Sequence, residues 1–230
     1  MLARYHIRPY TPQDRDAVWT LVADTAFFGA PVEAFLEDRA LYCSLFAAYY
    51  TDYESERLWV AEANGVVLGY IMGCGDSRKR LRIFLTRILP GVVGGVLRHR
   101  YTIGRKALAY ACRALREVFA GKALTAIMAQ FPGHLHTGVA ASARGQGIGR
   151  ALLETSLRQF WATGVCGVHL VTTDHNQVAC HLYESVGFRL LDTYRTRLWN
   201  GFVQDVQTRI YGIKPQWQYD AAVDCKCAQA

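Results

Sequence analysis

Apolar and polar positions in the first third of the chain follow the periods of strands and helices. They predict a strand at 5–8, a helix beginning near 11, a helix over 33–50, and strands at 58–62 and 66–72. Asn64 and Gly65 separate the last two strands, and this pair favours a tight two-residue hairpin turn. The first third is therefore expected to supply a strand, two helices and a β-hairpin.

The second half of the chain alternates strands with helices. It predicts a strand at 135–140, a helix at 148–164, a strand at 168–172, a helix at 177–186, and strands at 188–198 and 206–213. The central order strand–helix–strand is a βαβ unit, whose two strands lie parallel in one sheet. We therefore predict an α/β fold, and the sequence contains no internal repeat.

The segment at about 76–124 is helical in pattern and strongly basic. Its first apolar stripe, Leu81 to Leu89, is expected to end at Pro90-Gly91, and a second helix is expected over about 104–119. Residues 78–122 hold twelve Lys or Arg and one acidic residue, a formal charge of +11, whereas the whole chain carries +7. The basic character therefore belongs to this one insertion.

Three interpretations of the basic insertion stay open. A helical lid with a solvated basic face is preferred, and attraction of an acidic acceptor or partner is the second interpretation. Peripheral contact with an anionic membrane, through a basic amphipathic helix, is the third and is not favoured. No nucleic acid partner is expected, because the segment lacks the interleaved aromatic residues of a stacking platform.

Length and composition limit the class of protein. The chain has 230 residues, 51% of them hydrophobic, which suits one large domain with an insertion. It has no run of roughly 18 apolar residues and no signal-peptide core, so a cytoplasmic protein is expected. Its seven cysteines are odd in number, which favours buried free thiols. Cys225-Lys226-Cys227 has no second Cys/His pair at zinc spacing nearby, so a loose tail is preferred to a metal site.

A glycine-rich loop connects the strand at 135–140 to the following helix. It comprises Arg144, Gly145, Gln146, Gly147, Ile148, Gly149 and Arg150. Glycine lets backbone N–H groups approach a ligand, and a helix N-terminus adds unpaired donors and positive dipole charge, so a phosphate or pyrophosphate pocket is predicted. The loop reads R-x-x-G-x-G, which matches neither the dinucleotide fingerprint nor the P-loop.

A second motif follows in the next strand–helix unit. Asn176, Ala179 and Tyr183 are spaced as N-x-x-A-x-x-x-Y, and Gly187-Phe188 follow after three intervening residues. With the R-x-x-G-x-G loop, this order resembles the Gcn5-related N-acetyltransferases, the GNAT family. One departure is Ala141-Ser142-Ala143, where the family often has a proline and an aromatic residue.

The resemblance covers about 1–75 and 125–213. It implies a single GNAT domain over 1–213, with a mixed central sheet splayed at the acetyl-CoA site. The basic segment at about 76–124 is then an insertion into this domain, and 214–230 form a C-terminal tail.

The resemblance also implies which groups bind acetyl-CoA. They are Gly138, Val139, Ala140, Arg144, Gly145, Gln146, Gly147, Ile148, Gly149, Arg150, Asn176 and Tyr183. The loop amides cradle the pyrophosphate and the two arginines screen its charge. The strands at 135–140 and 168–172 splay apart after a bulge, pantetheine pairs with residues 138–140, and the amide of Val139 or its neighbour polarises the thioester carbonyl. Asn176 bonds the pantetheine or caps the helix start.

Catalytic candidates lie at the ends of the two central strands. Tyr183 is the candidate acid, because a phenol stays protonated at neutral pH and can donate to the leaving sulfur. The general base is open among His134, His136, Asp174, His175 and a water chain. His136 is placed closest to the reactive carbonyl, although a lone strand histidine is more often a structural residue.

The expected activity is transfer of an acetyl group from acetyl-CoA to an amine by direct attack. It requires no metal and no acyl-enzyme, so none of the cysteines is needed as a nucleophile. A non-catalytic acyl-CoA-binding module is the main alternative, but such a module would not need Tyr183. Transfer of a longer acyl chain is a second alternative. The acceptor is not identified by any motif, and a homodimer through the late strands is an arrangement that the resemblance allows.

Overall fold

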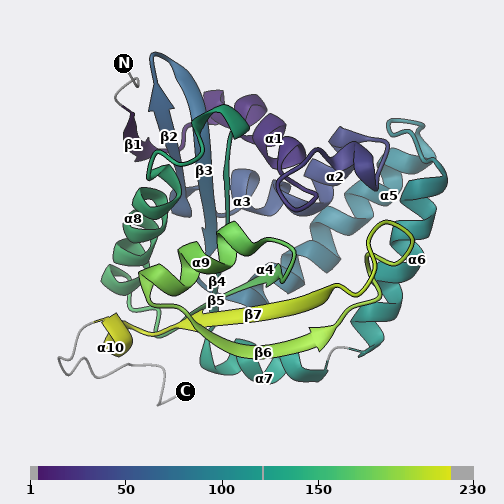
Figure 1. Cartoon of the computed structure of the whole chain (residues 1–230). Helices are drawn as coiled ribbons and strands as arrows, with labels where there is room; N and C mark the ends of the chain where they lie inside the picture. Colours follow the sequence, from purple (N-terminus) through teal and green to yellow (C-terminus); the bar gives the residue numbers. More distant parts are fainter. Residues whose placement is uncertain (1–4, 121, 219–230) are drawn as a thin grey trace.

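The computed structural model describes residues 5–120 and 122–218, and its centre is a seven-stranded sheet (Figure 1). The strands are β1 (His6–Pro9), β2 (Leu58–Ala63), β3 (Val66–Cys74), β4 (Gly133–Val139), β5 (Val168–Thr173), β6 (Arg189–Arg195) and β7 (Gln207–Ile213). They lie in the order β1-β2-β3-β4-β5-β7-β6. Only β4 and β5 are parallel among the neighbouring pairs of the described strands. The prediction of an α/β fold with a mixed sheet is confirmed.

Helices cover both faces of the sheet. They are α1 (Arg15–Asp24), α2 (Arg39–Phe46), α3 (Ala48–Asp52), α4 (Ser77–Ile83), α5 (Leu89–Leu97), α6 (Arg105–Ala120), α7 (Lys122–Gln130), α8 (Ile148–Ala162), α9 (Gln177–Val186) and α10 (Pro215–Gln218). Side chains alternate along β3, so Tyr70 and Met72 enter a core with α1, α2, α3 and α5, whereas Ile71 enters a second core with α8 and α9. The central strands are therefore buried between two helical layers, whereas the edge strand β6 is largely exposed.

The hairpin predicted at Asn64-Gly65 is present between β2 and β3. Both residues have positive φ, 52° and 77°, as a tight turn that matches the strand twist requires. The single helix predicted over 33–50 is wrong, because this region forms a short 3-10 turn at Val32–Ala34 and then α2 and α3. Asp38 causes the new start: its carboxylate accepts from the amide of Leu41 at 2.7 Å and caps α2.

The basic insertion contains more helix than predicted. Pro90 does not end the first helix, since the chain stays helical from α4 through a π-helical turn at Phe84–Ile88 into α5. Pro90 lies in the first turn of α5, where a missing N–H is tolerated. The helix expected over about 104–119 is present as α6, and α7 after it was not predicted.

The parallel pair β4 and β5 separates soon after it begins. Only Gly133↔Val168 and His134↔His169 are paired, so the rest of both strands faces an open gap, as the resemblance implied. The bulge expected in β4 is absent from its ladder with β3, which runs in regular register to Val139. Gly138 is needed for close approach instead: a Cβ there would lie 2.7 Å from the Tyr70 ring.

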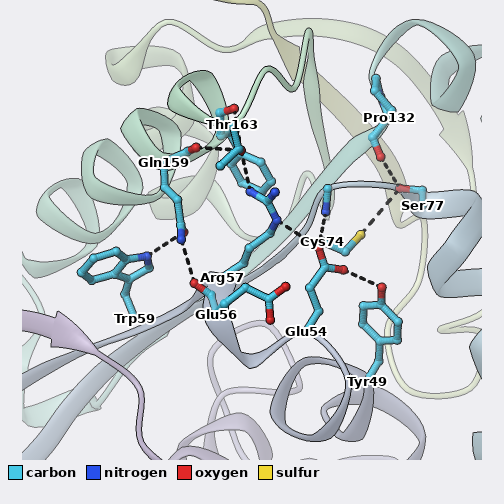
Figure 2. A network of polar contacts seen from close by, with 12 residues as sticks. Tyr49, Glu54, Glu56, Arg57, Trp59, Cys74, Ser77, Pro132, Gln159 and Thr163 are labelled. Carbon is cyan, nitrogen blue, oxygen red and sulfur yellow. Dashed lines mark hydrogen bonds and ion pairs between the residues drawn. The ribbon is translucent and has the colours of Figure 1, made fainter. Parts of the chain in front are cut away.

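A buried carboxylate, that of Glu54, accepts several hydrogen bonds near the end of the gap where β4 and β5 are still paired. Figure 2 shows Glu54 between Tyr49, whose hydroxyl donates to it at 2.5 Å, and Arg57, whose Nε donates at 2.9 Å. Glu54 also accepts from the amide of Gly75, directly after β3, at 2.9 Å. Nearby, the Ser77 hydroxyl donates to the carbonyl of Pro132, directly before β4, at 2.9 Å. The network ties the end of β3 to the start of β4, on the side where β5 is still paired.

The predicted tail is helical at its start, where α10 is formed, and Cys225 and Cys227 lie outside the described residues. Cys43, Cys74, Cys166 and Cys180 are buried free thiols, as predicted, whereas Cys112 is exposed on α6. Among the helices of the described ranges, none has the length and hydrophobicity that a membrane crossing requires.

Candidate active site at the β4–β5 gap

A cavity of about 260 Å³ opens where β4 and β5 separate. β4 lines it with Leu135, His136 and Thr137, and β5 lines it with Leu170 to Thr173. The same cavity is lined by Asn176, at the N-cap of α9, and by Tyr183, within α9. The structure therefore brings three of the predicted site residues, Tyr183, His136 and Asn176, to one place.

Tyr183 lies on the buried face of α9, with 7% of its surface exposed. Burial raises the pKa of its phenol above the ordinary value of 10, so the hydroxyl is protonated at neutral pH. Within the described part of the chain, no protein group forms a hydrogen bond with this hydroxyl. A buried donor without a protein partner at a cavity wall is available to a ligand.

Asn176 occupies the N-cap position of α9 without capping it through its side chain. Only its backbone bonds to the first turn of α9: the carbonyl of Asn176 accepts from the amide of Cys180 at 3.0 Å. Asn176 also lines the cavity. Of the two roles implied for Asn176, contact with a ligand is the one that its placement favours.

The amide of Val139 points into the gap. Ala140 donates its amide to the carbonyl of Leu68 on β3 at 2.8 Å. Successive amides of a strand point to opposite sides, so those of Thr137 and Val139 point away from β3, towards β5. β5 no longer pairs with β4 at this level, so neither amide has an acceptor on β5. Both amides can therefore donate to a ligand in the gap.

The glycine-rich loop presents a row of backbone donors at the N-terminus of α8. Gly145 and Gly147 have φ of 77° and 79°, which strongly favour glycine. No amide from Gly145 to Arg150 donates to another backbone group in the loops of the described residues. The first N–H groups of α8 also have no acceptor within the helix. The loop therefore has the geometry of an anion site.

The two arginines of the loop already have protein partners. Arg144 donates to the carbonyls of Gly29 at 2.7 Å and Val139 at 3.3 Å. Arg150 donates to the Ser185 hydroxyl at 2.7 Å, at the end of α9. These contacts join the loop to the segments on either side of the gap, so the arginines position the loop as well as adding positive charge.

His136 lies in the cavity wall among aromatic rings. The ring of Phe46 is 4.3 Å away, that of His134 4.4 Å, and that of Tyr50 5.8 Å, between centroids. Burial, and secondarily the charge of Arg80, lower the pKa of His136 to about 3. The imidazole is therefore neutral at pH 7 and is a weak proton acceptor.

The other candidates for a general base lie outside the cavity lining. His134 is buried and its Nδ1 is 3.1 Å from the Tyr50 hydroxyl, which makes it a satisfied structural histidine. Asp174 accepts from the amide of Gln207 at 2.9 Å and closes the end of β5 on β7. His175 packs against Phe28, with ring centroids 5.7 Å apart. The sequence analysis had placed His136 closest to the reactive carbonyl, and of these candidates His136 is the one that lines the cavity of the described residues.

The buried His136 predicts a loss of stability in acid. Unfolded histidine takes up a proton below pH 6.5, whereas folded His136 does so only near pH 3, so its contribution is full above pH 6.5 and is lost as pH falls towards 3. Between pH 7.5 and 5, His136→Gln should remove about 2 kcal/mol of the fall in unfolding free energy, measured by urea denaturation. The exposed His6→Gln should leave the fall unchanged, and an unchanged fall in His136→Gln would show that His136 is not held neutral.

Sequence reasoning missed the aromatic side of the cavity. This side is formed by Phe28, Phe35, Tyr42, Phe46, Tyr110 and Trp199. They come from the loop after α1, from α2, from α6 and from the loop between β6 and β7.

Comparison with known proteins agrees with this geometry. Residues 114–190, which contain the glycine loop and Tyr183, match the family model described as an acetyltransferase (GNAT) domain. A mycothiol acetyltransferase of Nocardiopsis dassonvillei is 43% identical over 56 residues; this match covers 24% of the chain and only 17% of that protein.

Two solved structures extend the similarity to the whole fold. The crystal structure of SsHAT has 29% identity and a TM-score of 0.72, over 91% of this chain and 98% of that one. The structure of yncA from Salmonella typhimurium with its cofactor acetyl-CoA has 16% identity and a TM-score of 0.56, over 98% of this chain and 100% of that one. With the splayed sheet and the two motifs in place, these matches show that the chain has the fold of the Gcn5-related N-acetyltransferases and that residues 114–190 match the GNAT domain of that family.

Proposed function

We propose that the protein transfers an acetyl group from acetyl-CoA to a primary amine by direct nucleophilic attack. The observation that carries this proposal is the unpartnered hydroxyl of Tyr183, protonated and buried beside a strand whose amides face an open gap. A cavity with a proton donor and free backbone donors suits a thioester better than it suits a phosphate alone.

Acetyl-CoA has polar groups that match the unbonded donors of the loop and of β4 among the described residues. The amides from Gly145 to Arg150 bind the pyrophosphate, and the pantetheine amides pair with the edge of β4 that faces the gap, where the amides of Thr137 and Val139 point. Asn176 gives its carboxamide to the pantetheine. Arg144 and Arg150 hold the loop in place through their contacts with Gly29 and Ser185, and their charge adds to the attraction for phosphate.

The reaction needs one donor for oxygen and one for sulfur. The amine nitrogen bonds to the thioester carbon, and the amide of Val139 stabilises the negative charge that develops on the carbonyl oxygen. The carbon–sulfur bond then breaks, and Tyr183 donates its hydrogen bond, and finally its proton, to the sulfur. The proton lost by the amine nitrogen restores Tyr183, so the products are an N-acetyl amine and the free thiol.

His136 acts as a hydrogen-bond acceptor for the attacking amine in this proposal. Deprotonation of an alkylammonium of pKa near 10 costs about 4 kcal/mol at pH 7, and transfer of its proton to a base with a pKa of about 3 would cost about 9.5 kcal/mol, so His136 does not act as that base. The surroundings that keep His136 neutral also disfavour a cationic amine at the same place. The amine therefore reacts as the neutral form that enters the cavity, oriented by the imidazole.

A panel of amines with acetyl-CoA tests the proposal. We expect release of free thiol and formation of an acetylated amine of matching amount, read by thiol colorimetry and mass spectrometry. Butyryl-CoA in a parallel reaction should be slower, because a cavity of about 260 Å³ must also hold the acceptor. Tight binding of acetyl-CoA without acetylation of any amine would instead support an acyl-CoA-binding module.

A further inference from the structure

The acceptor side of the cavity is an aromatic wall made of Phe28, Phe35, Tyr42, Phe46, Tyr110 and Trp199. The rings form one connected cluster, in which Phe35 is buried and Tyr110 and Trp199 are half-buried. Trp199 lies 5.0 Å from Phe28 and 5.2 Å from Phe35, and Phe35 lies 4.7 Å from Tyr110, between ring centroids. These separations are those of edge and tilted aromatic contacts.

The same wall leads to the reacting position. Phe35 packs edge-on against Tyr42 at 5.7 Å, and Tyr42 stacks on Phe46 at 5.3 Å and 12°. Phe46 in turn contacts His136 at 4.3 Å. An acceptor lying along these rings has its amine at His136, beside the end of the gap between β4 and β5.

Polar contacts hold the separate parts of the wall together. Glu37 accepts from the amides of Lys106 at 2.8 Å and Ala107 at 3.0 Å, which fixes the start of α6 on the loop that carries Phe35. Glu117 accepts from the amide of Arg197 at 2.8 Å, which fixes α6 on the loop that carries Trp199. The wall is thus preformed, and the basic insertion contributes Tyr110 to it through α6.

The cavity carries no formal charge at neutral pH. Among the described residues that line it, none is Asp, Glu, Lys or Arg, and His136 is held neutral. A diamine or an amino acid would bring a second charge that finds no counter-charge in this lining. A flat ring would meet aromatic edges and faces instead.

We propose that the acceptor is an arylalkylamine, a primary amine on a short alkyl chain that ends in an aromatic ring. The proposal rests on the acetyl transfer proposed above and names its acceptor class. The aromatic ring packs against Trp199 and Tyr110, which Phe35 supports from behind, and the alkyl chain passes Tyr42 and Phe46 to bring the amine to His136.

The test compares 2-phenylethylamine with 1,4-diaminobutane and glucosamine in the full-length protein with acetyl-CoA. We expect kcat/KM for 2-phenylethylamine to exceed that of either competitor by at least about 100-fold. Acetylation of the diamine or the sugar amine with equal efficiency would overturn the acceptor class and leave acetyl transfer intact. Calorimetric binding of 2-phenylethylamine without acetylation of any amine would contradict acetyl transfer and leave the arylalkylamine as the class of molecule that the cavity binds.

A matched pair of tryptophan variants locates the binding. Trp199→Leu should raise KM for 2-phenylethylamine at least about tenfold and leave the Kd of acetyl-CoA unchanged. Trp59→Leu, which removes an indole on β2 outside the cavity lining, should change neither value. If Trp199→Leu does not fold, Tyr110→Leu tests the same wall from α6. An unchanged KM in a folded wall variant would contradict the proposal.

Discussion

Tyr183→Phe is expected to lower kcat by about 100- to 1,000-fold and to leave the Kd of acetyl-CoA within about twofold of the wild type. The substitution removes one oxygen atom from a side chain whose hydroxyl has no protein partner among the described residues, so no packing contact or internal hydrogen bond is lost. The loss should fall on the step that expels the thiolate. Steady-state kinetics at constant pH, with calorimetry for acetyl-CoA, measure the two quantities.

Tyr211→Phe is the matched control for this variant. Tyr211 lies 6.1 Å from Tyr183 between ring centroids, and its hydroxyl donates to Glu184 at 2.8 Å. It does not line the cavity, so its loss should lower stability without lowering kcat. Full activity of Tyr183→Phe would remove the acid role, and equal loss in both variants would point to a general effect on folding.

Gly147→Ala is expected to weaken acetyl-CoA binding by about 10- to 100-fold, or roughly 1.4–2.7 kcal/mol. Gly147 has φ of 79°, where a Cβ strains the backbone, and the new methyl group stands at the loop whose amides are assigned to the pyrophosphate. Calorimetry with acetyl-CoA and with coenzyme A measures the effect. Both ligands should lose the same factor, because they share the pyrophosphate.

Gly164→Ala separates strain from ligand contact. Gly164 has φ of 77° with open space around its Cβ position, and it lies at the other end of α8. Both substitutions therefore carry a similar backbone cost and should lower the melting temperature alike. An equal loss of coenzyme affinity in the two variants would show that the loop amides are not the pyrophosphate site.

Local signals predicted the parts of the site that lie next to each other in the chain. The helix from Gln177 to Val186 was predicted with its observed bounds, because Gly187, at φ of 105°, ends it. Asn176 and Tyr183 are one motif on that helix, so their shared cavity was predictable. The gap between β4 and β5 followed from the family resemblance and not from periodicity.

The rest depends on contacts between distant segments. The aromatic wall joins residues as far apart as Phe28 and Trp199, and no period or spacing within one segment signals it. His136 and His134 alternate on one strand, yet one reaches the cavity and the other bonds Tyr50, a difference set by α3. Pro90 was mistaken for a helix end because its place just after a π-helical turn is not visible in the sequence.

The most direct test of the account is a crystal structure of the protein with acetyl-CoA bound. We predict pantetheine in the gap between β4 and β5, with the thioester oxygen facing the amide of Val139. The sulfur should lie within about 3.5 Å of the Tyr183 hydroxyl, and the pyrophosphate should lie on the amides from Gly145 to Arg150. Pantetheine bound outside the gap, or a sulfur that does not reach Tyr183, would contradict the account.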